Sequence, residues 1–196
     1  MVANRIEAIV MGGSSGALEA LSTLLPALPA RCTIPVAIVV HLPPARPSHL
    51  AQVLGARTLL PVREAEDKEP IAAGTVYVAP PNYHLLVERT KTFALSADEP
   101  VLFSRPAIDV LFESAADAYG HHLAAIVLTG ASADGARGLS AVKRRGGIAI
   151  VQSPDGALAP EMPRAALSMT KADHVLSLEE LAALLGRLAR EDKESR

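Results

Sequence analysis

The stretch Val10-Met11-Gly12-Gly13-Ser14-Ser15-Gly16-Ala17 joins an apolar segment, residues 6–11, to an apolar helix expected to begin near Ser15. Its Gly12-x-Ser14-x-Gly16 spacing has the form of a nucleophile elbow, a tight strand-to-helix turn that exposes a serine hydroxyl. Glycines flank the serine because so sharp a turn needs backbone angles and close contacts that a Cβ would resist. The free N–H groups and positive dipole end of the following helix would face this turn, so it could hold an oxyanion or a phosphate.

Short apolar segments alternate with helical segments along most of the chain. Because strands joined by helices pair in parallel, this alternation predicts an α/β fold: a single doubly wound, mainly parallel sheet with helices on both faces and an antiparallel edge hairpin. We expect one domain over residues 1–190 and a charged tail at 191–196. The expected strands are residues 6–11, 36–40, 62–65, 76–79, 124–128, 148–151 and 174–176, with the hairpin at 85–87 and 92–95, and the expected helices include 47–54, 106–119 and 161–168.

The composition favours a cytoplasmic protein of one domain. A length of 196 residues, 49% of them hydrophobic, is enough to bury a substantial core. The formal charge of −2 argues against nucleic acid or an anionic membrane as the main partner. The single cysteine, Cys32, excludes an internal disulfide and fits a reducing compartment. Because no charged segment precedes an apolar core at the start, we expect no secretory signal. Prolines interrupt the long uncharged stretch at residues 70–87, so we also expect no membrane insertion.

Three polar side chains follow strong strands of the predicted sheet. Ser14 follows residues 6–11, His41 follows residues 36–40, and Asp134 lies in the loop after residues 124–128. Ligands of doubly wound sheets bind at the carboxyl ends of the strands, so these side chains are expected along one edge. A serine becomes a nucleophile when an imidazole takes its proton, and a carboxylate can orient that imidazole. The pattern therefore predicts acyl transfer by Ser14, His41 and Asp134.

Each of these residues also has a simpler interpretation. The turn could bind phosphate, although Ser14 takes the second glycine position of the dinucleotide pattern and no Gly-Lys-Ser/Thr follows. His41 could be an ordinary loop histidine, Asp134 could be a helix N-cap, and Ser15 is the alternative nucleophile. A non-catalytic binding module that uses the Ser14 turn for an anion or a partner protein is therefore an alternative. A nucleotide-binding protein is disfavoured, because His41 stands where a Rossmann protein carries its acidic ribose-binding residue.

The other histidines are weaker candidates for chemistry. His121 and His122 are adjacent, so on regular structure their side chains would point in different directions. The sequence holds no H-E-x-x-H motif and no Cys–His pattern with metal-ligand spacing. We therefore expect neither a metal nor a cofactor.

The sequence resembles the catalytic domain of the chemotaxis protein-glutamate methylesterases, the CheB-type receptor demethylases, over nearly its whole length. The resemblance implies a doubly wound α/β fold, with Ser14, His41 and Asp134 matching the family's catalytic triad. It further implies hydrolysis of glutamate γ-methyl esters on the cytoplasmic helices of chemoreceptors, and in some members deamidation of glutamines. The matching pieces are Gly12-Gly13-Ser14-Ser15-Gly16, Val40-His41-Leu42-Pro43, Gly74-Thr75-Val76-Tyr77-Val78-Ala79-Pro80 with His84-Leu85, Arg105-Pro106-Ala107-Ile108-Asp109-Val110-Leu111-Phe112, Leu128-Thr129-Gly130 through Asp134-Gly135-Ala136, and Glu161-Met162-Pro163.

Further site roles are expected from the same motifs. The nucleophile turn supplies Gly13 and Ser15 for oxyanion binding, and Gly130, Ala131 and Met162 are expected to bind oxyanion or substrate. The family's aspartate loop carries Met and Gly where this chain has Ala131 and Ser132, a difference expected to affect substrate fit. Typical members also carry an N-terminal receiver domain, whereas this sequence starts five residues before its first catalytic-domain strand, so we expect a standalone domain.

Overall fold

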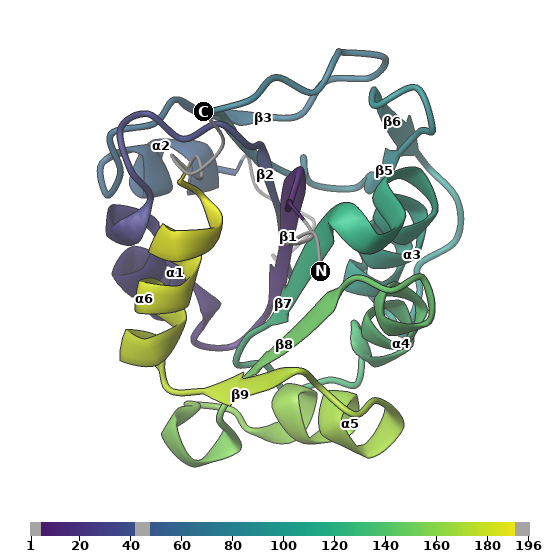
Figure 1. The fold of residues 1–196 in the computed structure, drawn as a ribbon. Coiled ribbons are helices and arrows are strands. Elements are labelled where there is room, and N and C mark those ends of the chain that lie inside the picture. Colours follow the sequence, from purple (N-terminus) through teal and green to yellow (C-terminus); the bar gives the residue numbers. More distant parts are fainter. Residues whose placement is uncertain (1–4, 42–47, 191–196) are drawn as a thin grey trace.

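The computed structural model of the chain describes residues 5–41 and 48–190. Seven parallel strands form one sheet in the order β3-β4-β2-β1-β7-β8-β9, with helices on both faces (Figure 1). The predicted doubly wound α/β fold is therefore confirmed. The strands are β1 (Ala8–Gly13), β2 (Val36–Val40), β3 (Val62–Glu64), β4 (Val76–Val78), β7 (Leu123–Val127), β8 (Ile148–Gln152) and β9 (His174–Leu176).

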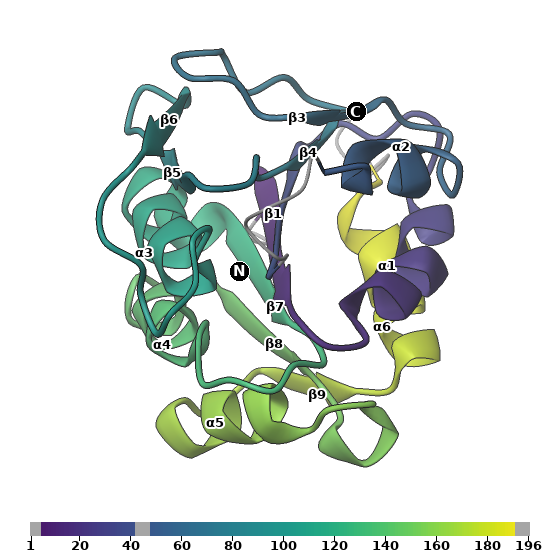
Figure 2. The same ribbon diagram turned by 180° about the vertical axis from the view of Figure 1, so that it is seen from behind.

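The helices form two layers (Figures 1 and 2). On one face lie α1 (Ala17–Leu24), α2 (Leu50–Gly55) and α6 (Leu178–Leu188), and on the other lie α3 (Ile108–Tyr119), α4 (Ala136–Arg144) and α5 (Glu161–Met169). The central strands are buried on both faces, so their side chains alternate between two hydrophobic cores. Ile9 and Met11 of β1 enter the α1–α6 core, whereas Ala8 and Val10 enter the α3–α4 core.

The hairpin is antiparallel, as expected, and it forms a separate two-stranded sheet from β5 (His84–Val87) and β6 (Phe93–Ser96). It does not extend an edge of the main sheet, because its apolar side chains pack into the α3–α4 core. Leu85 and Phe93 are fully buried there. The N–H of Val87 donates to the hydroxyl of Ser114 in α3 at 3.1 Å, which ties the hairpin to that helix.

The ends of the elements follow local chemistry. Ser177 and Glu180 form the expected capping box at the start of α6, where each side chain accepts the other residue's backbone N–H. Strand β1 runs two residues further than expected, and α1 starts only after Gly16, whose φ of +81° forms a left-handed N-cap. The expectations for residues 42–47 and for the tail at 191–196 lie outside the described residues.

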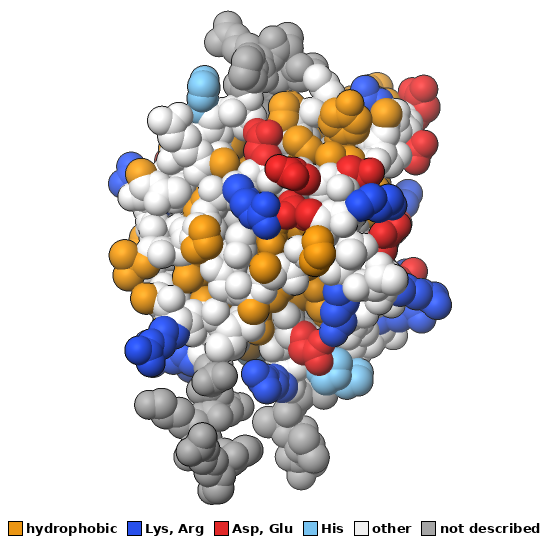
Figure 3. Space-filling model, turned by 90° about the horizontal axis from the view of Figure 1, so that it is seen from above, with side chains coloured by type: hydrophobic (Ala, Val, Ile, Leu, Met, Phe, Trp, Pro, Cys, Tyr) orange, Lys and Arg blue, Asp and Glu red, His pale blue; other side chains and the backbone are white. Residues whose placement is uncertain are grey.

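Ion pairs connect neighbouring surface segments. Lys91 pairs with Glu7 at 2.6 Å, and Lys68 pairs with Glu88 at 2.9 Å. On the face drawn in Figure 3, acidic and basic side chains lie next to one another among hydrophobic ones. Within the described parts of the chain, no helix is both long and apolar enough to span a bilayer.

Candidate active site

The strand order reverses on either side of β1, which lies between β2 and β7. Such a switch point is where doubly wound sheets form their ligand sites. Ser14 follows β1, His41 follows β2, and Asp134 lies in the loop after β7. Two backbone hydrogen bonds join these segments: His41 N–H donates to Gly13 C=O at 3.2 Å, and Ser14 N–H donates to Thr129 C=O at 2.9 Å. The structure therefore brings the three predicted segments to one edge of the sheet.

The Ser14 turn presents its side chain at the surface and free N–H groups beside it. Ser14 is partly exposed, and its C=O accepts the N–H of Ala17 at 2.9 Å, which closes the turn. Among the described residues, no acceptor bonds to the backbone N–H groups of Ser15 and Gly16. These two N–H groups stand at the start of α1 and are the donors best placed for an oxyanion.

A hydrogen bond of 2.8 Å joins His41 Nε2 to Asp134 Oδ2. The His41 side chain is 13% exposed and that of Asp134 is fully buried. The Asp134 carboxylate also accepts the N–H groups of Ile108 at 2.6 Å and Asp109 at 2.9 Å. Asp134 is thus a helix cap, but for α3 rather than for α4, whose N-cap is Gly135. Because these backbone donors already fix the carboxylate as an acceptor, the neutral His41 ring carries its proton on Nε2.

The second ring nitrogen of His41 faces a serine that the sequence did not single out. The hydroxyl of Ser104 lies 3.3 Å from His41 Nδ1. With the proton on Nε2, Nδ1 holds the lone pair that a general base needs, so the Ser104 hydroxyl donates to it. Within the described residues, no hydrogen bond links the Ser14 hydroxyl to His41. The predicted serine–histidine contact is therefore replaced by Ser104–His41 in this structure.

Gly130 lies between Ser14 and Met162. A Cβ built at Gly130 would lie 3.0 Å from Ser14 Cβ and 2.6 Å from Met162 Cε. The N–H of Gly130 donates to Ala159 C=O at 2.9 Å, and its C=O accepts the N–H of Met162 at 2.8 Å. The backbone N–H and C=O of Gly130 are thus both hydrogen-bonded within the protein, and Gly130 is a close-packing position behind Ser14. Its expected part in binding oxyanion or substrate stays a prediction.

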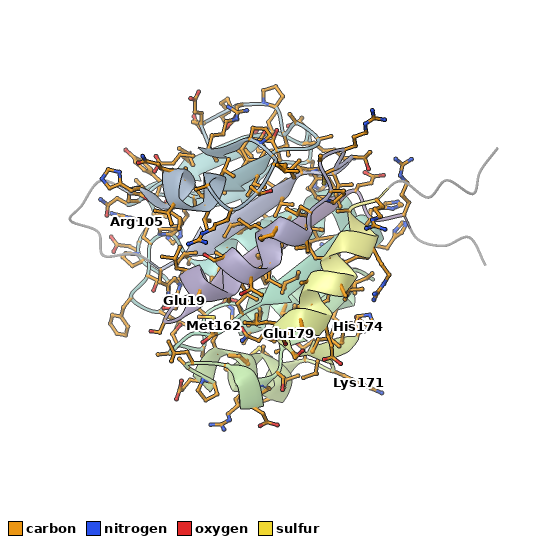
Figure 4. All side chains as sticks on the ribbon, turned by 90° about the vertical axis from the view of Figure 1, so that its left-hand side faces the viewer. Glu19, Arg105, Met162, Lys171, His174 and Glu179 are labelled. Atoms are coloured by element: carbon orange, nitrogen blue, oxygen red, sulfur yellow. The ribbon has the colours of Figure 1, made fainter. Side chains whose placement is uncertain are left out.

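Gly13, Met162 and Ala131, which are also expected to bind oxyanion or substrate, lie in three different environments. Gly13 lies in β1, where its C=O holds the backbone of His41. Met162 is buried, whereas Ala131 is exposed at the surface of the aspartate loop. Ser132, which follows it, accepts the N–H of Asp134 at 3.3 Å through its hydroxyl. Met162 of α5 and Glu19 of α1 lie on the left-hand side in Figure 4, as does Arg105, which follows Ser104.

Thr129 and Gln152 support the nucleophile turn from behind. Besides accepting the N–H of Ser14, Thr129 donates its hydroxyl to Ser15 C=O at 2.9 Å. The buried side chain of Gln152 accepts the N–H of Thr129 at 2.8 Å. A polar residue that ends an apolar strand, as Gln152 does after residues 148–151, is the sequence signal that could have identified this support.

Asp109 is a further buried carboxylate beside Asp134. Its Oδ1 accepts the N–H groups of Gly135 at 2.9 Å and Gly138 at 2.7 Å, while its Oδ2 is buried without a hydrogen-bond partner among the described residues. Burial raises the pKa of Asp109, with a smaller contribution from the nearby Asp134 charge, and the Gly138 N–H opposes the rise. The described residues contain no cluster of three or more His, Cys, Asp or Glu side chains able to hold a metal.

A serine turn, a paired histidine and a buried aspartate, at the switch point of a doubly wound sheet, are the residue types found in serine hydrolases. The family within that class follows from the sequence match. Residues 9–185 match the family model of the CheB methylesterases, and the chain belongs to this family. The resemblance and the expected enzyme class, a carboxylic ester hydrolase, are thereby confirmed.

Two relatives of this chain carry the name protein-glutamate methylesterase/protein-glutamine glutaminase. A Leptospira interrogans protein is 48% identical over 190 residues, which cover 97% of this chain and 98% of that protein. The protein-glutamate methylesterase/protein-glutamine glutaminase of Archaeoglobus fulgidus is 36% identical over 177 residues, 89% of this chain and 51% of that protein. The chain thus spans about half the length of the latter relative.

A solved structure agrees with the computed one. The Thermotoga maritima CheB methylesterase catalytic domain matches with a TM-score of 0.88 at 32% sequence identity. The match covers 93% of this chain and 98% of that domain.

Proposed function

We propose that this chain hydrolyses the γ-methyl esters of glutamate residues on the cytoplasmic helices of chemoreceptors and releases methanol. Ser14 is the nucleophile, His41 is the general base and acid, and Asp134 orients His41. Glutamine side chains at such positions would be deamidated by the same attack, with ammonia as the leaving group. The observation that carries the proposal is the 2.8 Å hydrogen bond between His41 and Asp134, beside the turn that bears Ser14.

In the first half of the reaction, the Ser14 oxygen attacks the ester carbonyl while His41 Nδ1 takes the hydroxyl proton. His41 must first exchange the Ser104 hydroxyl, now 3.3 Å away, for that of Ser14. The backbone N–H groups of Ser15 and Gly16 stabilise the oxyanion, and one such donor is worth roughly 3 kcal/mol. The C–O bond to the methoxy group then breaks, and His41 gives its proton to the departing methanol.

In the second half, water attacks the acyl-enzyme and His41 again takes the proton. Collapse of this intermediate breaks the bond to the Ser14 oxygen, which takes the proton from His41, and leaves a glutamic acid side chain that gives its own proton to solvent. Asp134 stabilises the imidazolium at each step, and its own position is fixed by the N–H groups of Ile108 and Asp109.

The test compares three serine variants for methanol release from a methylated receptor fragment. Ser14→Ala should abolish release without unfolding the protein. Ser15→Ala should retain release, because Ser15 contributes its backbone N–H. Ser104→Ala should also retain release, because the Ser104 hydroxyl only bonds to His41 while no substrate is bound. Release by Ser14→Ala at the wild-type rate would overturn the assignment of the nucleophile.

A non-catalytic binding module is the second candidate, and one observation favours it: the Ser14 hydroxyl has no hydrogen bond to His41 among the described residues. A fluorophosphonate probe separates the two functions, since it labels only a hydroxyl that a base has activated. Labelling mapped to Ser14 by mass spectrometry supports the esterase. Complete absence of labelling supports the binding module.

A further inference from the structure

Residues 101–104 form a tight two-residue turn with an exposed apolar tip. Val101 and Ser104 exchange backbone hydrogen bonds of 3.1 Å and 2.9 Å across the turn. The two tip residues have positive φ angles, +47° for Leu102 and +65° for Phe103. Turns with this geometry favour Asn-Gly, because bulky side chains are strained at positive φ. Phe103 is nevertheless fully exposed at 101% relative exposure, and Leu102 is half-exposed.

This tip stands directly beside the candidate base. The next residue, Ser104, places its hydroxyl 3.3 Å from His41 Nδ1. Arg105 then anchors the turn, donating its guanidinium N–H groups to the C=O groups of Ala97 at 2.8 Å and Asp98 at 3.0 Å. The exposed ring is thus held next to the site by a fixed segment of chain.

A second exposed apolar side chain lies on the nucleophile side. Leu158 is 78% exposed, and it lies against the Ser14 turn: a Cβ built at Gly16 would be 2.9 Å from Leu158 Cβ. Large apolar side chains therefore stand at the surface beside both Ser14 and His41. Neither the strained backbone of Leu102 and Phe103 nor the exposure of their apolar side chains stabilises the folded protein. Features that cost stability and lie together beside a site indicate a function there.

We propose that Leu102 and Phe103 form a docking tip that contacts apolar side chains flanking the ester-bearing glutamate of a protein substrate. This inference rests on the proposed function. In a glutamyl ester the reacting carbon is three bonds from the backbone Cα, so that backbone lies within about 4 Å of it. A polypeptide held so close to Ser14 must run over the rim of the site, where the docking tip stands. Burying the Phe103 ring there supplies the affinity that aromatic anchors give to protein interfaces.

Phe103→Asn tests the docking tip without disturbing the turn. Asparagine tolerates positive φ, so the variant keeps the backbone and loses only the ring. Two substrates are compared: a methylated receptor fragment and the γ-methyl ester of N-acetylglutamate N-methylamide. We expect kcat/KM on the receptor fragment to fall about tenfold or more, chiefly through KM, with kcat/KM on the small ester unchanged. The Tm should stay the same or rise, because a strained position is relieved.

The matched control is Leu59→Asn. Leu59 is also a large exposed apolar residue, at 82% exposure, but it precedes β3 and so lies toward the amino ends of the strands, away from Ser14. The Leu59→Asn variant should leave kcat/KM unchanged on both the receptor fragment and the small ester. An unchanged rate of Phe103→Asn on the receptor fragment, or an equal loss on both substrates, overturns the docking tip. Failure of the wild-type protein to release methanol from either substrate would instead overturn the proposed function.

Discussion

Asp109 and Asp134 each accept the backbone N–H groups that begin the other's helix. Asp134, just before α4, accepts from Ile108 and Asp109 at the start of α3, and Asp109 accepts from Gly135 and Gly138 at the start of α4. Two buried like charges are costly to hold together, and here the positive ends of two helices offset that cost. The exchange also fixes the carboxylate that bonds to His41. Helix packing and the geometry of the site therefore depend on the same four hydrogen bonds.

Asp109→Ala should destabilise the protein by about 2–5 kcal/mol, because the N–H groups of Gly135 and Gly138 would be buried without an acceptor. Asp109→Asn is the matched variant, since its amide oxygen can accept both. Urea unfolding followed by circular dichroism measures the two free energies. Equal losses in the two variants would show that charge, rather than the capping hydrogen bonds, is the important contribution.

The pH dependence of stability should carry the signature of Asp109. Burial raises the pKa of Asp109 above its ordinary value of 3.8. In the pH interval between that value and the raised pKa of the folded state, the folded protein keeps a proton that the unfolded protein releases. Stability contributed at this position therefore falls as the pH rises through the interval. The unfolding free energy of wild type minus that of Asp109→Asn should fall as the pH rises above the ordinary pKa of Asp109. A difference that grows with pH would contradict the raised pKa.

Asp134→Asn should preserve the fold and remove most of the activity. The amide oxygen can still accept an N–H group of α3, but the amide N–H₂ cannot accept the proton of His41 Nε2. The ring then favours the tautomer whose lone pair is on the wrong nitrogen, a change that lowers kcat by about 10⁴-fold in serine proteases. The measurement is kcat for methanol release, with the circular dichroism spectrum as the control for folding. An Asp134→Asn variant with wild-type kcat would remove Asp134 from the mechanism.

Most of the fold could be predicted because buried strands in this chain are almost purely apolar. Residues 36–40 match the buried strand β2 to the residue, and the ends expected for most other elements lie within two residues of those observed, those of the largely exposed β9 included. The hairpin was predicted as a pair, but its separation from the main sheet depends on tertiary packing against α3. Periodicity alone does not contain that information, since both arrangements bury the same alternate side chains.

The site was predictable in its segments and less so in its contacts. Strand ends locate Ser14, His41 and Asp134 along one edge, because parallel strands point the same way. The residues around Asp134 do not indicate that it caps α3, a helix that starts 26 positions earlier, rather than α4, the helix that follows it. The sequence did not indicate Ser104 for the same reason, since its partner His41 is 63 residues away. The turn that positions Ser104, residues 101–104, also has two bulky residues at positive φ, which no sequence pattern predicts. Such contacts arise from packing between distant segments.

Gly130→Ala should test how closely the wall of the site fits Ser14. The new methyl group would lie 2.6 Å from Met162 Cε, 2.8 Å from Met162 Sδ and 3.0 Å from Ser14 Cβ. The thioether end of Met162 can move, so we expect a loss of about 1–3 kcal/mol, typical of overpacking. The contact with Ser14 Cβ should displace the nucleophile and lower kcat on a small ester.

A double-mutant cycle with Met162→Ala separates these two effects. If the clash is with the thioether, Gly130→Ala should cost less stability in the Met162→Ala background, with a coupling of about 0.5 kcal/mol or more. The loss in kcat should persist there, because the contact with Ser14 Cβ remains. Urea unfolding and steady-state kinetics on all four proteins complete the cycle. Additive stabilities would mean that Met162 does not restrict position 130, and full recovery of kcat would mean that Ser14 is displaced only through Met162.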